Sequence, residues 1–126
     1  MDIRKLQKAV VTALEDIKAR DIEAYDVKHL TSLFDRVVIA SAESARQTKA
    51  LARNVQDKAR EAGARVYGLE GEDSGEWVLV DLGDIVVHIM QPAVRLHYNL
   101  EELWNQPKPR APRKRPARSA APAKSR

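Results

Sequence analysis

A predicted β-hairpin between residues 77 and 90 constrains the fold of this chain more than any other segment. Two apolar runs flank Gly83-Asp84, and a two-residue loop with glycine first is typical of a type II′ turn. This turn places three aliphatic pairs on one face: Leu82–Ile85, Val80–Val87 and Val78–Ile89. The opposite, mixed face pairs Asp81 with Val86, Leu79 with His88 and Trp77 with Met90. A slip of one residue would bury Asp81 and His88, so the aliphatic face is expected to be the core.

The remaining segments predict helices and strands around this hairpin. Apolar residues at helical spacing indicate a helix over 3–17, and a second helix begins after Ser41 or Ser44 and ends at Gly63. Strands are expected at 25–31, 36–41 and 65–70, and the segment 36–41 is apolar enough to be a central strand. Asn99 followed by Glu102 resembles a capping box that starts a short last helix. The order α-β-β-α-β-β-β-α predicts an α/β fold with a mixed sheet of about five strands flanked by helices.

The charge distribution divides the chain into two parts. Residues 1–105 hold 14 Lys/Arg and all 18 Asp/Glu, whereas residues 106–126 hold 8 Lys/Arg and no acid. We therefore expect a domain over 1–105 and a basic, proline-rich tail over 106–126 that is disordered, because it has no large aliphatic residue to bury. The chain has no cysteine and no apolar segment near its start, so we expect a cytoplasmic protein.

The search for catalytic motifs leaves one weak candidate site. The sequence has no phosphate-binding glycine loop, no H-E-x-x-H and no G-x-S-x-G. Asp81, Asp84 and His88 could form a metal or acid–base site on the mixed face. The favoured alternative is that Asp84 is a turn residue and that Asp81 and His88 form a hydrogen-bonded surface pair. We therefore expect no enzymatic activity, no cofactor and no metal.

The mixed hairpin face is better suited to binding a partner than to chemistry. Trp77 and Met90 could be core residues under a helix or exposed anchors, and the sequence favours anchors because the opposite face already supplies an aliphatic core. The tail is either a solubilising extension or, as its charge density favours, a nucleic-acid contact. The cations assigned to that contact are Arg110, Arg113, Lys114, Arg115 and Arg118.

Residues 76–104 resemble the ribosomal silencing factor family, also called Iojap-like. The matching pattern is Trp77…Asp81-x-Gly83-Asp84-x-Val86-Val87-His88…Pro92-x-x-Arg95-x-x-Tyr98-x-Leu100-Glu101-x-Leu103-Trp104. Upstream, Asp35-Arg36-Val37-Val38-Ile39-Ala40-Ser41-Ala42-Glu43-Ser44 resembles the family's D-Y-F-V-I-A-T-G-x-S. Arg36-Val37 replaces the usual aromatic pair, and Ala42-Glu43 replaces the small-residue turn. The resemblance covers about residues 3–105 and excludes the tail.

This resemblance implies a nucleotidyltransferase-like α/β fold without that superfamily's catalytic carboxylates. It also implies a homodimer-forming protein that binds large-subunit ribosomal protein number fourteen, sterically keeps the small subunit from joining, and so represses translation when nutrients are scarce. The predicted partner-binding residues are Tyr67, Trp77, Leu79, Asp81, His88, Met90, Arg95 and Tyr98. Two alternatives are a nucleotidyltransferase-like enzyme that uses Asp81, Asp84 and His88 with Mg²⁺, and a small RNA-binding module driven by the tail.

Overall fold

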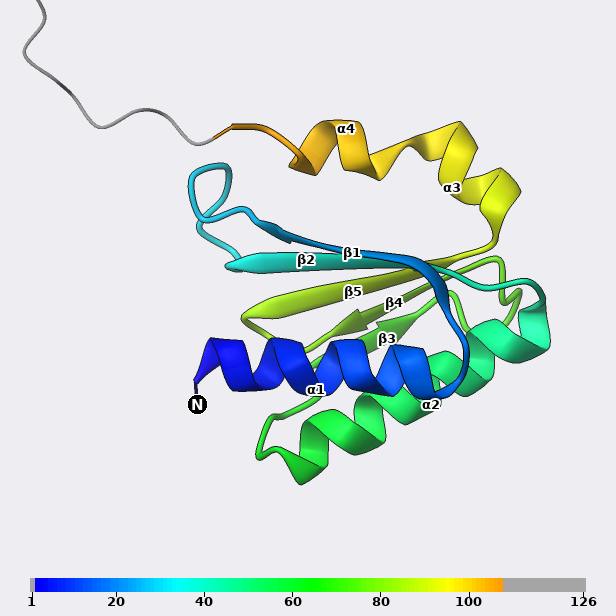
Figure 1. The fold of residues 1–126 in the computed structure, drawn as a ribbon, viewed down its shortest axis with the longest axis horizontal. Coiled ribbons are helices and arrows are strands. Elements are labelled where there is room, and N and C mark those ends of the chain that lie inside the picture. Colours follow the sequence, from blue (N-terminus) through cyan, green and yellow to red (C-terminus); the bar gives the residue numbers. More distant parts are fainter. Residues whose placement is uncertain (1, 108–126) are drawn as a thin grey trace, which may run out of the picture.

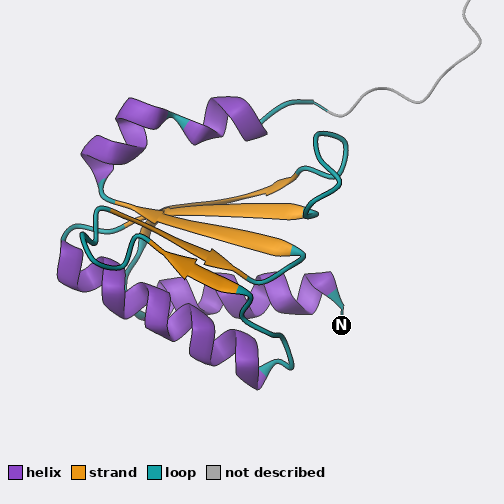
Figure 2. Cartoon of the chain, turned by 180° about the vertical axis from the view of Figure 1, so that it is seen from behind, coloured by secondary structure: helices purple, strands orange, loops and turns teal. Residues whose placement is uncertain are grey.

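The computed structural model describes residues 2–107, which form one mixed β-sheet with helices on both faces (Figures 1 and 2). The elements in chain order are α1 (Ile3–Asp16), β1 (Arg20–Asp26), β2 (Arg36–Ser41), α2 (Ala45–Glu61), β3 (Gly68–Glu70), β4 (Trp77–Asp81), β5 (Ile85–Met90), α3 (Pro92–Tyr98) and α4 (Leu100–Trp104). The five strands lie in the order β1-β2-β5-β4-β3. Strands β2 and β5 are parallel, and the other neighbours are antiparallel. The predicted mixed five-stranded sheet is confirmed.

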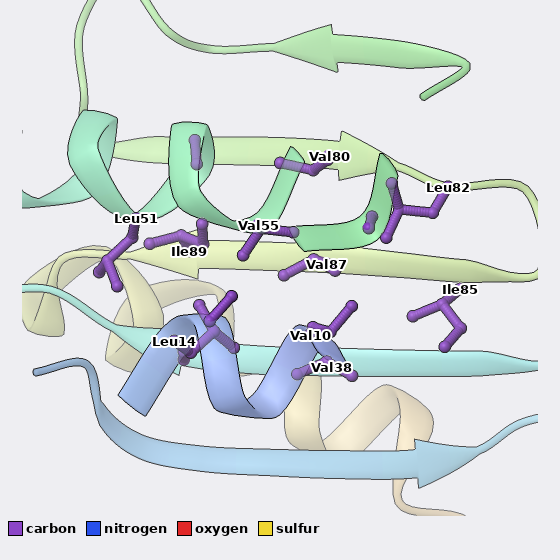
Figure 3. Packing of buried hydrophobic residues seen from close by; sticks show 14 of the residues in the cluster. Val10, Leu14, Val38, Leu51, Val55, Val80, Leu82, Ile85, Val87 and Ile89 are labelled. Atoms are coloured by element: carbon purple, nitrogen blue, oxygen red, sulfur yellow. The ribbon is translucent and has the colours of Figure 1, made fainter. Parts of the chain in front are cut away.

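Helices α1 and α2 cover one face of the sheet and enclose the main core (Figure 3). The predicted hairpin register is confirmed, since Val78 pairs with Ile89 and Val80 with Val87, and all four side chains are fully buried. Strand β2 lies between β1 and β5 as a central strand, with Val38 and Ala40 in this core. Ser44, and not Ser41, caps α2, because its Oγ accepts a hydrogen bond from the backbone N–H of Gln47 at 3.0 Å.

Helices α3 and α4 cover part of the opposite face (Figures 1 and 2). A second cluster lies beneath them, built on Val27, Val37, Ile39 and Met90. The predicted short last helix is confirmed as α4, with Asn99 at its N-cap position. A second helix, α3, was not predicted and precedes it, beginning at Pro92, whose fixed φ and missing N–H suit the first turn of a helix. Asn99 adopts a left-handed φ of 46° between the two helices, and its side chain makes no capping hydrogen bond. The predicted capping box is therefore wrong.

Two of the observed strands, β1 and β3, differ in their bounds from the predicted strands. Strand β1 spans Arg20–Asp26 instead of 25–31, and its register shifts between Arg20 and Glu23 where Asp21 has a φ of 50°. This irregularity breaks the alternation of apolar and polar residues that marks a strand in the sequence. Strand β3 is limited to Gly68–Glu70, three residues at the sheet edge, instead of 65–70. Among the described residues, no helix is long and apolar enough to cross a membrane.

Candidate functional site

An open groove of about 600 Å³ lies on the mixed face of the hairpin, beside α4. Its lining is mostly apolar and comes from the loop before β2, from β3, β4 and β5 with the residues beside them, and from α4: Leu33, Phe34, Tyr67, Glu70, Leu79, Asp81, Gly83, Val86, His88, Leu100, Leu103 and Trp104. We call this feature the α4 groove. A smaller recess of about 260 Å³ adjoins it, lined by Glu70, Gly71, Trp77 and Leu79. Together they form a continuous hollowed surface at the uncovered end of the sheet.

Several apolar side chains of the α4 groove are open to solvent. Leu33, Tyr67 and Leu103 are 80%, 62% and 55% exposed. Apolar side chains gathered in a concave surface are typical of a protein-binding site, because their burial by a partner is favourable. Gly83 contributes to the shape of the groove, since a Cβ at its φ of 87° would lie only 2.8 Å from the Tyr67 ring. The turn glycine therefore lets Tyr67 lie over the hairpin turn.

Arg95 fixes α3 and α4 against the sheet and so positions one wall of the α4 groove. Its Nε donates to Glu101 Oε2 at 2.8 Å, and its Nη1 donates to the backbone carbonyl of Asp21 at 2.7 Å and to Ser41 Oγ at 2.9 Å. The Arg95 side chain is only 8% exposed, and Glu23 Oε2 lies 4.0 Å from its Nη2. This guanidinium joins α4, β1 and β2, which are distant in sequence. Arg95 was predicted to contact a partner, but its burial makes it a structural clamp in this chain.

Trp77 and His88 form a hydrogen-bonded pair where the α4 groove meets the recess. The indole Nε1 donates to His88 Nδ1 at 3.0 Å, and the Trp77 ring also lies 4.8 Å from the Tyr98 ring. An indole N–H can only donate, so Nδ1 must be unprotonated and the neutral imidazole carries its proton on Nε2. His88 is 7% exposed, and its burial lowers the imidazole pKa from 6.5 to about 4. His88 is therefore neutral at physiological pH.

We predict that this pair makes stability pH-dependent in acid. Because the folded pKa is lower than the unfolded value, the unfolded chain binds more protons between pH 6.5 and about 4. The contribution of His88 is fully present above pH 6.5 and is lost as the pH falls, by on the order of 3 kcal/mol in total. Chemical denaturation from pH 7 to pH 4 measures it. The variant His88→Gln, which cannot titrate, should lose less stability over this range, and an unchanged pH dependence would contradict the assignment.

The Asp81–His88 hydrogen-bonded pair predicted from the hairpin register does not form. Asp81 Oδ1 instead accepts a hydrogen bond from the backbone N–H of Gly83 at 2.8 Å, so this carboxylate stabilises the turn. Asp84 follows Gly83 in the same turn and is exposed. Within residues 2–107, no group of three or more His, Asp or Glu side chains is placed to hold a metal ion. The site is therefore a concave, mostly apolar surface that also carries a few polar side chains, and such a surface is suited to binding and not to catalysis.

The structure places the predicted partner-binding residues in three different settings. Tyr67, Leu79, Asp81 and His88 line the α4 groove, whereas Trp77 lines the recess and its ring packs against that of Tyr98. Met90 is fully buried, so its interpretation as an exposed anchor is wrong: it is core under α3 and α4. Trp77 is half-buried and packs against the same cluster. The predicted tail contacts, from Arg110 to Arg118, lie outside the described residues.

Sequence reasoning missed the residues that form the far wall of the α4 groove. They are Leu33, Phe34, Leu100, Leu103 and Trp104. Leu33-Phe34 is an apolar pair that follows Thr31-Ser32 in a loop between two strands, and such a pair needs either a core or a partner. This apolar pair in a loop was therefore a sequence signal for a binding surface. The helical spacing of Leu100, Leu103 and Trp104 indicated an apolar helix face, but nothing in the sequence indicated which strand it would approach.

A match to a protein-family model identifies the family of this chain. The model described as "Ribosomal silencing factor during starvation" matches residues 1–126, which extends beyond the 3–105 expected from the sequence. This chain belongs to the ribosomal silencing factor family. The family is one of ribosome regulators and is not known as a family of enzymes. Its members silence ribosomes, and this assigns the chain a role in translation regulation.

Individual relatives of this chain agree with the family match. Ribosomal silencing factor RsfS of Chromobacterium violaceum is 54% identical over 109 residues, which cover 86% of this chain and 89% of the relative. A crystal structure of a Chromobacterium violaceum protein has a TM-score of 0.82 at 54% identity, covering 87% of this chain and 92% of that one. A mouse protein named "Mitochondrial assembly of ribosomal large subunit protein 1" is 33% identical over 98 residues, covering 75% of this chain and 43% of that protein.

Proposed function

We propose that this protein silences ribosomes by docking the α4 groove and its adjoining recess on the large ribosomal subunit. The contact is with large-subunit ribosomal protein number fourteen, and the docked domain sterically blocks the small subunit, which represses translation under nutrient limitation. The observation that carries this proposal is the open apolar lining of the groove, with Leu33 at 80% exposure, in a member of a ribosome-silencing family. The name of the mouse relative refers to the large subunit, which supports that choice of subunit.

The charge around the α4 groove favours a basic protein over RNA as the partner at this face. Among the described residues, the lining of the groove contains two carboxylates, Glu70 and Asp81, and no Lys or Arg. The segments of the domain outside α1, α2 and their flanks, residues 21–44 and 67–105, hold 13 Asp/Glu against 3 Lys/Arg. Such an acidic surface repels a phosphate backbone and attracts a basic protein surface. The apolar groove would then supply most of the binding free energy, and the surrounding carboxylates would steer association.

Mixing separated subunits with the purified protein tests the steric part of this proposal. We expect the fraction of complete ribosomes on a sucrose gradient to fall as the protein is added, with a matching rise in free large and small subunits. The control is the same titration with a variant whose groove is disabled, Leu33→Asp with Leu103→Asp. Unchanged subunit joining at saturating amounts of the wild-type protein would refute the blocking mechanism.

We also propose a homodimer in which two copies cover the same exposed apolar side chains. An apolar face of this kind is rarely left open in a monomer, and a self-complementary patch gives a two-fold dimer. Dimer formation and docking on the large subunit would then compete for one face. Sedimentation velocity should show self-association that Leu33→Asp weakens. A monomer at every accessible concentration would contradict the dimer without affecting the docking proposal.

The basic tail is proposed to touch ribosomal RNA once the domain has docked. Its eight cations in residues 106–126 can neutralise phosphates without sequence specificity. Tethering this weak interaction beside the docked domain raises the affinity through effective concentration. Deletion of residues 106–126 should therefore reduce affinity for the large subunit and flatten its dependence on salt, with a change of about 0.7 in the log–log slope for each phosphate that is no longer neutralised. Equal salt slopes for the full chain and for the chain without residues 106–126 would show that the tail does not bind phosphates.

A further inference from the structure

The charged residues of the domain are segregated between its two sides. Residues 2–20 and 45–66, which contain α1 and α2, hold 11 Lys/Arg against 5 Asp/Glu, the reverse of the balance in the rest of the domain. Figures 1 and 2 show that α1 and α2 lie together on the face of the sheet opposite α3 and α4. The face covered by α1 and α2 is therefore basic, whereas the face that carries the α4 groove is acidic. A domain with two such different faces can contact two chemically different partners.

The cations of α2 are presented outward on one stripe of the helix. Arg46, Lys49 and Arg53 are spaced by three and four residues, which places their side chains in a row along the helix surface. All three are exposed, and none makes an ion pair within residues 2–107. No ion pair therefore holds these side chains, so they remain available to an anionic ligand.

A recess between α1 and α2 gives part of this stripe a concave shape. The recess has a volume of about 430 Å³ and is lined by Ile17, Lys49, Ala50, Arg53, Asn54 and Asp57. Two side chains of α2 hold the end of α1 in place: Asn54 Nδ2 donates to the Ala13 carbonyl at 2.8 Å, and Gln47 Nε2 donates to the Ile17 carbonyl at 2.9 Å. One carboxylate, Asp57, faces two cations in this recess, so its net charge is positive.

The chemistry of this face favours RNA over a membrane or an apolar protein partner. Within residues 2–107, the large hydrophobic side chains that are exposed all lie outside α1 and α2: Leu30, Leu33, Tyr67, Leu96, Tyr98 and Leu103. A membrane-surface helix needs such residues to insert, and a protein interface needs them as anchors. Cations alone are sufficient to bind a phosphate backbone, because counterion release supplies the favourable free energy.

We propose that the outer face of α1 and α2, centred on Lys49 and Arg53, binds the phosphate backbone of RNA. This site is separate from the α4 groove and lies on the other side of the sheet, so both faces can be occupied at once. A protein docked through its groove would present this basic face to RNA on the opposite side. The interaction depends on charge and shape and carries no sequence preference.

Salt-dependent binding of the full chain to an oligouridine of about 20 nucleotides tests the proposal. The variant Lys49→Gln with Arg53→Gln removes two cations, so we expect its log–log salt slope to be shallower than that of the wild type by about 1.4, at about 0.7 for each phosphate of single-stranded RNA that is no longer neutralised. The matched control is Lys28→Glu, which lowers the net charge by the same amount on the acidic side of the domain and is also exposed. Its slope should stay close to that of the wild type.

Three outcomes would overturn this proposal. Equal slopes for the wild type and the double variant would show that Lys49 and Arg53 do not bind phosphates. An equal change in Lys28→Glu would show that only net charge matters. Binding of vesicles rich in anionic lipid with the same dependence on Lys49 and Arg53, together with unchanged RNA binding, would assign the face to a membrane instead. Circular dichroism must show that the double variant remains folded, and a groove variant with normal RNA binding keeps this proposal separate from the docking proposal.

Discussion

Replacing Arg95 with alanine is expected to destabilise the domain by about 3 kcal/mol. The change removes the hydrogen bonds to Glu101, Ser41 and the Asp21 carbonyl, and it leaves the Glu101 carboxylate, whose side chain is 27% exposed, without its cation. The destabilisation should concentrate in α3 and α4, because Arg95 joins them to the first two strands. Urea denaturation measures the free energy of unfolding, and hydrogen exchange shows whether α3 and α4 lose protection first.

Arg95→Lys is the informative control for this clamp. It keeps the positive charge, but an ammonium group cannot reproduce the forked geometry that reaches three partners, so we expect it to restore less than half of the missing stability. Lys28→Ala, on an exposed side chain, should change stability by less than about 0.5 kcal/mol. If Arg95→Ala unfolds at the same urea concentration as the wild type, the clamp is not a stabilising feature.

The double variant Leu33→Asp with Leu103→Asp is expected to lose at least about 30-fold in affinity for the large subunit while remaining folded. Loss of a hot-spot side chain typically costs about 2 kcal/mol or more, which corresponds to this factor. Both residues are largely exposed, at 80% and 55%, so the free energy of unfolding should change little. Titration of labelled protein with purified large subunits measures the affinity, and thermal unfolding measures the stability.

Leu96→Asp provides a matched control for the groove variant. Leu96 is 83% exposed on α3 but does not line the α4 groove, so the same apolar-to-acidic change there should leave affinity nearly unchanged. If Leu96→Asp weakens binding as strongly as the double variant, the docking surface is centred on α3 and not on the groove. If neither change weakens binding, the groove is not the docking site.

The substitution Trp77→Ala is a less suitable test of docking than the sequence suggested. Its indole donates to His88 and packs against Tyr98 and the Met90 cluster, so Trp77→Ala would perturb packing as well as any partner contact. A loss of binding in that variant would have two explanations. The exposed leucines of the groove separate the two effects because they contribute little to the fold.

The parts of the fold that depend on local rules were predictable from the sequence. The hairpin register was correct in every pair, because the Gly83-Asp84 turn and the alternation of aliphatic side chains leave one arrangement without buried charge. The N-cap of α2 was narrowed to two serines, and Ser41 is excluded because it ends β2. The mixed sheet followed from the order of elements, although the exact ends of β1 and β3 did not.

The details of the mixed face depend on tertiary contacts that no local pattern encodes. Asp81 and Trp77 are both diagonal neighbours of His88 across the hairpin, and the register alone cannot choose between them. In the structure, the backbone N–H of Gly83 donates a hydrogen bond to the Asp81 carboxylate. His88 is therefore paired with Trp77 and not with Asp81. The burial of Met90 likewise depends on α3, and the sequence pattern does not reveal this helix because a proline such as Pro92 suits the end of a strand as well as the first turn of a helix.

Sedimentation of the purified wild-type chain with separated ribosomal subunits tests the central claim most directly. Docking through the α4 groove predicts that the protein sediments with isolated large subunits and not with small ones, and that Leu33→Asp with Leu103→Asp remains in the supernatant. Equal sedimentation with both subunits, or undiminished sedimentation of the double variant with large subunits, would contradict a docking surface in the α4 groove.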